Sequence, residues 1–148
     1  LEFRRVLFRS NFREPEVYFI AIKENGITLA RKIQHELHSI SDMRIHILEL
    51  TMDKGIPLEI TVSAMPPAEG AVIILIDDVA SSGKTMLYAL KPLLEIHPKK
   101  IETLVLVERT HKAFPVQVDY VGMSVATTLQ EHIYVEVAEG DIVGAYMD

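Results

Sequence analysis

Runs of apolar residues rich in β-branched types divide the chain into predicted strands, which lie at residues 17–22, 44–51, 72–76 and 101–107. The runs VYFIAI at 17–22 and VIILI at 72–76 have no polar interruption. Uninterrupted runs of this kind are typical of strands that are buried on both faces of a parallel sheet.

Apolar residues at helical spacing fill the intervals between some of these strands. One helix is predicted over 27–37 from Ile27, Ala30, Ile33 and Leu37. Another is predicted over 84–96 from Leu87, Leu90 and Leu94. Because proline cannot donate a backbone hydrogen bond, Pro92 should kink or end this second helix.

Shorter elements complete the pattern. A turn at residues 53–55 should let residues 58–62 return beside 44–51 as a hairpin, and further short strands are predicted near 118–121, 133–137 and 142–146. Strands that alternate with helices predict one α/β domain, with a mainly parallel sheet flanked by helices.

The first ten residues, LEFRRVLFRS, do not continue this pattern. They could form a fragment of an amphipathic helix, or they could be a non-native or truncated segment. We therefore expect the domain to span residues 11–148 and treat residues 1–10 separately.

Composition narrows the class of protein. The chain has 148 residues, no cysteine and a net charge of −6, so disulfides and thiolate metal sites are excluded and a cytoplasmic location is expected. No apolar run approaches the roughly 20 residues of a membrane-spanning helix. The acidic average disfavours a nucleic-acid binder, which usually needs a basic face.

The most informative chemistry follows the strand at 72–76. There, Asp77 and Asp78 precede a loop of small residues, VASSGKT, that opens the second helix. Free N–H groups at the start of a helix bind anions. Adjacent carboxylates instead suit sugar hydroxyls or a divalent metal. A phosphorylated sugar presents both kinds of group.

Three other kinds of segment share features with these residues. A nucleotide P-loop needs glycine where Asp78 stands, so Gly83-Lys84-Thr85 alone does not make one. Receiver domains carry paired acids near their start, whereas here they are in the middle of the chain. A capped helix with solvated acids stays open at this point.

The segment IILIDDVASSGKT, residues 73–85, resembles the phosphoribosyl-pyrophosphate signature of type I phosphoribosyltransferases. The resemblance extends to AIKENGITLA at 21–30 and to LVLVERTHKAFPVQVDYVG at 104–122, and it is strongest to the pyrimidine-operon attenuator and uracil phosphoribosyltransferase group. It implies that family's α/β fold with a small C-terminal hood, and with the N-terminal helix missing or replaced.

The resemblance also implies roles for individual residues. Asp77 and Asp78 would bind the ribose hydroxyls and take part in catalysis together with Lys23. Magnesium would be held mainly through the ligand, with Asp77 as an additional protein ligand. The 5-phosphate would be held by Ala80, Ser81, Ser82, Gly83, Lys84 and Thr85. The pyrophosphate would face Lys23, Glu24, Asn25 and Gly26.

The base is predicted from two positions at which this chain differs from one branch of the family. Enzymes that act on 6-oxopurines have an Asp where this chain has Ser81 and a Lys where it has Glu108, so a uracil-like base is favoured. The predicted base pocket comprises Glu108, Arg109, Val121 and Leu129. The hairpin at 53–57 is short for the family's lid and contributes only Lys54.

The expected partners are phosphoribosyl pyrophosphate, a nucleobase and a second copy of the chain. The alternative is a nucleotide-sensing regulator that binds RNA, as the related attenuator group does. Candidate contacts to RNA are Arg31, Lys32, Lys99, Lys100, Arg109 and Lys112. His35 and His38 are expected on the surface rather than in a zinc site, and His111 either in a solvated loop or in the base pocket.

Overall fold

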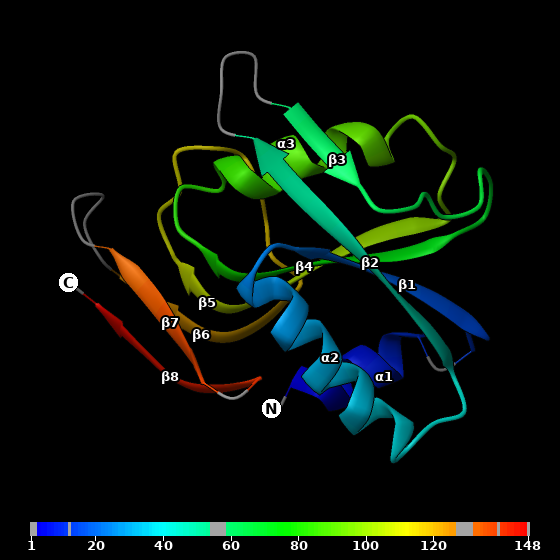
Figure 1. The fold of residues 1–148 in the computed structure, drawn as a ribbon, viewed down its shortest axis with the longest axis horizontal. Coiled ribbons are helices and arrows are strands. Elements are labelled where there is room, and N and C mark those ends of the chain that lie inside the picture. Colours follow the sequence, from blue (N-terminus) through cyan, green and yellow to red (C-terminus); the bar gives the residue numbers. More distant parts are fainter. Residues whose placement is uncertain (1–2, 12, 54–58, 127–131, 139, 148) are drawn as a thin grey trace.

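A computed structural model describes residues 3–11, 13–53, 59–126, 132–138 and 140–147. Its centre is a six-stranded sheet in the order β3-β2-β1-β4-β5-β6 (Figure 1). The strands are β1 Glu16–Ile22, β2 Arg44–Asp53, β3 Glu59–Val62, β4 Val72–Ala80, β5 Lys100–Arg109 and β6 Tyr120–Val125. Every neighbouring pair is parallel except β2 with β3, which pair antiparallel. The predicted mainly parallel sheet and the predicted hairpin partner are both confirmed.

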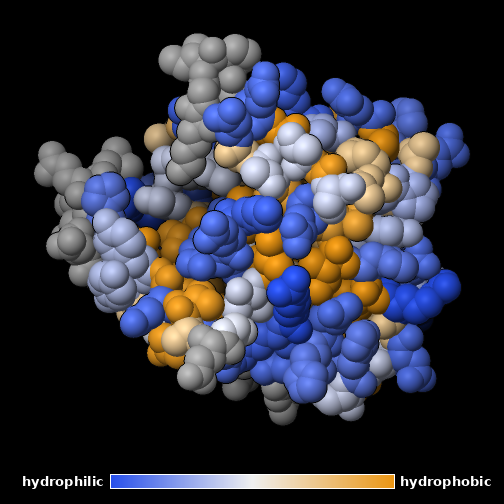
Figure 2. Space-filling model, in the orientation of Figure 1, coloured by the Kyte–Doolittle hydropathy of each residue, from blue (hydrophilic) through white to orange (hydrophobic). Residues whose placement is uncertain are grey.

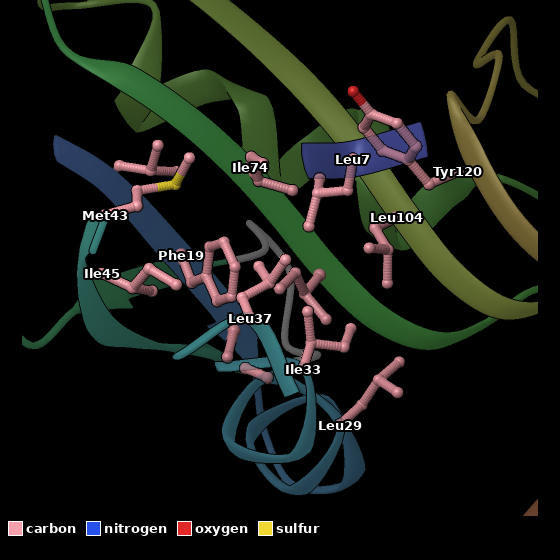
Figure 3. Close-up of a cluster of buried hydrophobic side chains, with 14 of the residues drawn as sticks. Leu7, Phe19, Leu29, Ile33, Leu37, Met43, Ile45, Ile74, Leu104 and Tyr120 are labelled. Carbon is pink, nitrogen blue, oxygen red and sulfur yellow. The ribbon is translucent and has the colours of Figure 1, made fainter. Parts of the chain in front are cut away.

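Helices cover both faces of the sheet. The helices α1 Phe3–Asn11 and α2 Asn25–His38 pack on one face, and α3 Lys84–Leu93 packs on the other. Adjacent strand residues therefore enter different cores: Phe19 and Ile74 join the α2 core (Figure 3), whereas Ile20 and Leu75 join the α3 core. This explains why the central strands have uninterrupted apolar runs, at residues 17–22 of β1 and 72–76 of β4. Apolar surface also shows at the centre of the face drawn in Figure 2, inside a hydrophilic border.

The N-terminal segment forms the helix that one interpretation of the sequence allowed. Leu7 of α1 is 2 % exposed and belongs to the α2 core. Asn11 donates from Nδ2 to Glu102 Oε1 at 3.1 Å, and Tyr120 donates its hydroxyl to Glu102 Oε2 at 2.7 Å. Burial raises the pKa of Tyr120 above its ordinary value. The origin of residues 1–10 stays a prediction.

Strand β4 extends further than the sequence predicts. The expected end was Ile76, but the strand continues to Ala80, with Asp77 and Asp78 inside it. The reason is the neighbouring strand, because Asp77, Val79 and Ala80 keep their pairing with β5. The two carboxylates therefore sit on regular strand backbone instead of in a loop.

The second predicted helix is shorter, and a different side of it is buried. It ends at Leu93, directly after Pro92, as a proline would cause. The predicted apolar stripe is wrong, because Leu94 is 69 % exposed and Leu87 and Leu90 are only partly buried. The buried residues are Met86, Ala89 and Leu93.

The last two strands form the expected C-terminal hood. The strands β7 Ile133–Ala138 and β8 Asp141–Met147 make a separate antiparallel pair that contacts α2 and β4. Lys32 on α2 donates to Asp141 Oδ1 at 2.6 Å and holds the pKa of Asp141 below its ordinary value. Within the described part of the chain, no helix has the length and apolar character to cross a membrane.

Candidate functional site

The connections of the sheet create a crevice at one of its edges. From β1 the chain passes through α2 to β2 on one side, and from β4 it passes through α3 to β5 on the other. Because β1 and β4 are neighbours, their carboxyl ends form a topological switch point, where ligands of open α/β sheets bind. A cleft of about 430 Å³ lies there. Its lining residues are Ile22, Lys23, Glu24, Thr51, Met52, Asp77, Asp78, Val79 and Thr85.

The two carboxylates of β4 are held by backbone and side-chain donors. Asp77, which is 8 % exposed, accepts from the Asp78 N–H at 2.8 Å. Asp78 accepts from the Val79 N–H at Oδ1 (2.8 Å) and from Asn25 Nδ2 at Oδ2 (2.9 Å). A carboxylate has about four acceptor positions. These hydrogen bonds therefore hold each carboxylate in a defined orientation.

The loop that follows β4 is supported by a second loop, which lies after β5. Gly83 has a φ of +83°, and a Cβ atom there would lie 3.2 Å from the Phe114 carbonyl oxygen. The Phe114 N–H donates to the Ser82 carbonyl at 3.0 Å. Helix α3 begins at Lys84, and the Thr85 of its first turn lines the cleft. Free N–H groups in the first turn of a helix can bind an anion, so this end of the cleft is where the sequence predicts the phosphate.

The segment after β1 forms the opposite wall of the cleft. Lys23 donates its N–H to the Leu50 carbonyl at 2.9 Å, and the Lys23–Glu24 peptide bond is cis. The Lys23 Nζ is 3.9 Å from Glu49 Oε2 on the surface. Asn25 and Gly26 were expected in the turn but are the first residues of α2.

The comparisons with known proteins decide the family. A sequence family described as "Phosphoribosyl transferase domain" matches residues 4–139 of this chain. The chain belongs to the type I phosphoribosyltransferase family.

Relatives and solved structures agree with this membership. Bifunctional protein PyrR of Streptococcus equi subsp. zooepidemicus is 33 % identical over 140 residues, which are 91 % of this chain and 81 % of that protein. Bifunctional protein pyrR of Enterococcus faecalis is 32 % identical over 136 residues, which are 85 % of this chain and 76 % of that protein.

Among solved structures, a Trypanosoma cruzi hypoxanthine phosphoribosyltransferase with IMP has a TM-score of 0.72 at 13 % identity and covers 84 % of this chain and 68 % of that one. A hypoxanthine-guanine phosphoribosyltransferase from Bacillus anthracis has a TM-score of 0.69 at 16 % identity and covers 84 % and 73 %. These likenesses show the fold of the family.

The residues predicted for the base pocket of this phosphoribosyltransferase do not all come together. Glu108 pairs with Ala80 across the strands, forms an ion pair with Lys112 and accepts from Ser124 Oγ at 3.3 Å. Arg109 is 2 % exposed. Val121 packs against the α3 core and is not among the residues that line the cleft. Leu129 and Lys54 lie outside the described residues.

Thr51 and Met52 line the cleft, although they were not predicted. Their position at the carboxyl end of β2 is the signal that would have identified them, because parallel strands present these ends at one edge.

Of the six candidate RNA contacts, five are buried or paired with a carboxylate, and Arg31 is exposed. Arg109 is buried. Four lysines pair with carboxylates: Lys32 with Asp141, Lys99 with Glu14, Lys100 with Glu102 and Lys112 with Glu108. His35, His38 and His111 are exposed, as expected for the first two. Among the residues that the structure describes, no three His, Asp or Glu side chains cluster as a metal cage.

Proposed function

We propose that this chain transfers ribose 5-phosphate from phosphoribosyl pyrophosphate to a nucleobase and releases pyrophosphate. One observation carries the proposal: two oriented carboxylates and a helix N-terminus line one cleft at the switch point. Asp77 and Asp78 would accept the ribose hydroxyls, residues 80–85 would hold the 5-phosphate, and Lys23 would face the pyrophosphate.

The chemistry requires little from the protein beyond position and charge. A ring nitrogen of the base forms a bond to C1 of the ribose and releases its proton to solvent, while the bond from C1 to the pyrophosphate oxygen breaks and pyrophosphate leaves. Positive charge that develops on the sugar ring is stabilised by the nearby carboxylates. Fixed groups such as these stabilise a transition state without reorganising.

The cleft fits a magnesium ion that is bound mainly by the substrate. The carboxylates that line the cleft are Glu24, Asp77 and Asp78, and the described residues form no complete set of protein ligands for a metal. Magnesium is commonly held by one or two carboxylates together with substrate phosphates. Asp77 would thus be its protein ligand, and the ion would supply charge neutralisation to the pyrophosphate.

A uracil-like base fits the chain better than a 6-oxopurine. Ser81 offers no carboxylate to take a proton from a purine nitrogen. The carboxylate of Glu108 accepts hydrogen bonds and cannot donate one to the purine oxygen. The resemblance of residues 73–85 and 104–122 to the uracil phosphoribosyltransferase group also favours this choice.

Conversion of radiolabelled bases tests the reaction and its specificity. Wild type, with phosphoribosyl pyrophosphate and magnesium, should convert uracil faster than hypoxanthine, guanine or orotate. Asp78→Asn should lower kcat/KM at least about tenfold, the loss of one charge-assisted hydrogen bond. Asp42→Asn, an exposed carboxylate outside the cleft, is the matched control. Conversion of no base by wild type would exclude the enzymatic function.

RNA binding is the second candidate, because the sequence resembles the pyrimidine-operon attenuator group, and relatives carry the name bifunctional protein. A filter-binding assay with a pyrimidine-operon leader RNA at low and moderate salt tests it. Affinity that falls as salt rises would support a regulator. The pairing of four candidate lysines with acids predicts weak binding.

A further inference from the structure

Asn25 joins three elements through one side-chain atom. Its Nδ2 lies 2.9 Å from Asp78 Oδ2 on β4 and 3.1 Å from the Val135 carbonyl oxygen on β7. These partners are 53 and 110 residues away along the chain. A side-chain amide has two N–H donors, so both are used. We call this pair of hydrogen bonds the Asn25 bridge.

The bridge is not a helix cap. Asparagine at the start of a helix usually accepts hydrogen bonds from the helix's own N–H groups. Here the N-cap is Glu24, and α2 has no side-chain cap hydrogen bond. Asn25 instead uses its donors, and it directs them away from α2.

The backbone beneath the bridge fixes its position. A Cβ atom at Gly26 would lie 2.9 Å from the Ile76 carbonyl oxygen, so α2 approaches β4 as closely as glycine allows. A second polar link between the described residues of α2 and the hood, Lys32 with Asp141, is exposed. Exposed ion pairs are screened by salt and contribute little. The partly buried bridge is therefore the stronger polar link between cleft and hood.

We propose that Asn25 is a positioning residue that couples the orientation of Asp78 to the docking of the hood. This inference rests on the proposed function, in which Asp78 binds the ribose. The amide fixes one oxygen of Asp78 while the Val79 N–H fixes the other. Because the same amide holds Val135, a ligand that engages Asp78 also stabilises β7.

Hydrogen exchange measured by mass spectrometry on the whole chain tests the bridge without ligand. Asn25→Leu removes both donors at similar volume, and Asn25→Asp keeps the shape but places an acceptor beside Asp78. Each should raise exchange in β7 and β8 about tenfold, the upper end of the effect of losing one neutral hydrogen bond, here the bond to the Val135 carbonyl. The matched control is Gln34→Leu. It removes the hydrogen bond from the Gln34 side-chain amide on α2 to the Ile45 carbonyl, and it should leave hydrogen exchange in the hood unchanged.

The coupling itself is tested by a double variant. Asp78→Ala should also raise exchange in the hood, and Asn25→Leu combined with Asp78→Ala should raise it no more than Asn25→Leu alone, since both act on one interaction. Hood exchange within twofold of wild type in both Asn25 variants, or additive effects in the double variant, would overturn the proposal.

Ligand provides the functional readout. Saturating phosphoribosyl pyrophosphate with magnesium should slow hood exchange in wild type and in Gln34→Leu, but not in Asn25→Leu, and the KM of Asn25→Leu for this ligand should rise about tenfold. Equal protection in all variants would refute the coupling. If wild type binds no phosphoribosyl pyrophosphate, the proposed function fails, and the ligand-free double variant still decides whether the bridge couples Asp78 to the hood.

Discussion

Asp77 and Asp78 show how a strand can carry carboxylates into a cleft. Successive strand residues point to opposite faces, so two adjacent acids diverge and can serve two sides of one ligand. Each accepts a backbone N–H from the residue that follows it. These bonds satisfy part of each carboxylate and fix its direction, which reduces the cost of placing charge at the end of a buried strand.

At Gly83 we predict that a single methyl group is costly. Gly83→Ala combines a left-handed φ, which costs about 1 kcal/mol, with a contact to the Phe114 carbonyl that must be relieved at about 1–3 kcal/mol more. Urea denaturation should show this loss of stability, and phosphoribosyl pyrophosphate should bind more weakly because the phosphate loop shifts.

Gly140 is the control position, because it has a left-handed φ but lacks a close contact. It has a φ of +76° and open space around it, so Gly140→Ala should show only the smaller conformational cost. Equal losses in the two variants would mean that the contact with Phe114 contributes nothing.

Among the elements, α3 tests the correction to the buried face. Met86 is 1 % exposed and Leu94 is 69 % exposed. Met86→Ala should therefore lower the free energy of unfolding by about 2–5 kcal/mol, whereas Leu94→Ala should change it by less than about 0.5 kcal/mol. If thermal or urea denaturation shows that Leu94→Ala destabilises the chain more than Met86→Ala, the buried face is instead the one that the sequence predicts.

Some helices and strands could be predicted from the sequence, and others could not. Strands β1 and β4 were predictable because both of their faces are covered and each contains an uninterrupted apolar run, at residues 17–22 and 72–76. The buried face of α3 was not, since Leu87, Leu90 and Leu94 share helical spacing with Met86, Ala89 and Leu93. The Asn25 bridge could not be predicted for another reason. Its partners are 53 and 110 residues away, and no local sequence pattern indicates contacts over such separations.

At the scale of the whole molecule, α1 contributes to the core beside α2. Leu7 is 2 % exposed in the α2 core, so Leu7→Ala should cost about 2–5 kcal/mol of stability. A chain that starts at residue 11 should be destabilised at least as much. If that shortened chain is as stable as the full one, residues 1–10 are dispensable to the fold, as the non-native interpretation predicts.

The central claim is that the cleft between β1 and β4 binds phosphoribosyl pyrophosphate. Titration calorimetry with this ligand and magnesium tests it most directly on wild type, Asp78→Asn and the control Asp42→Asn. We predict one site per chain for wild type and for the control, and an affinity at least about tenfold lower for Asp78→Asn, which loses charge-assisted bonds to the ribose. No binding by wild type, or equal binding by Asp78→Asn, would contradict the claim.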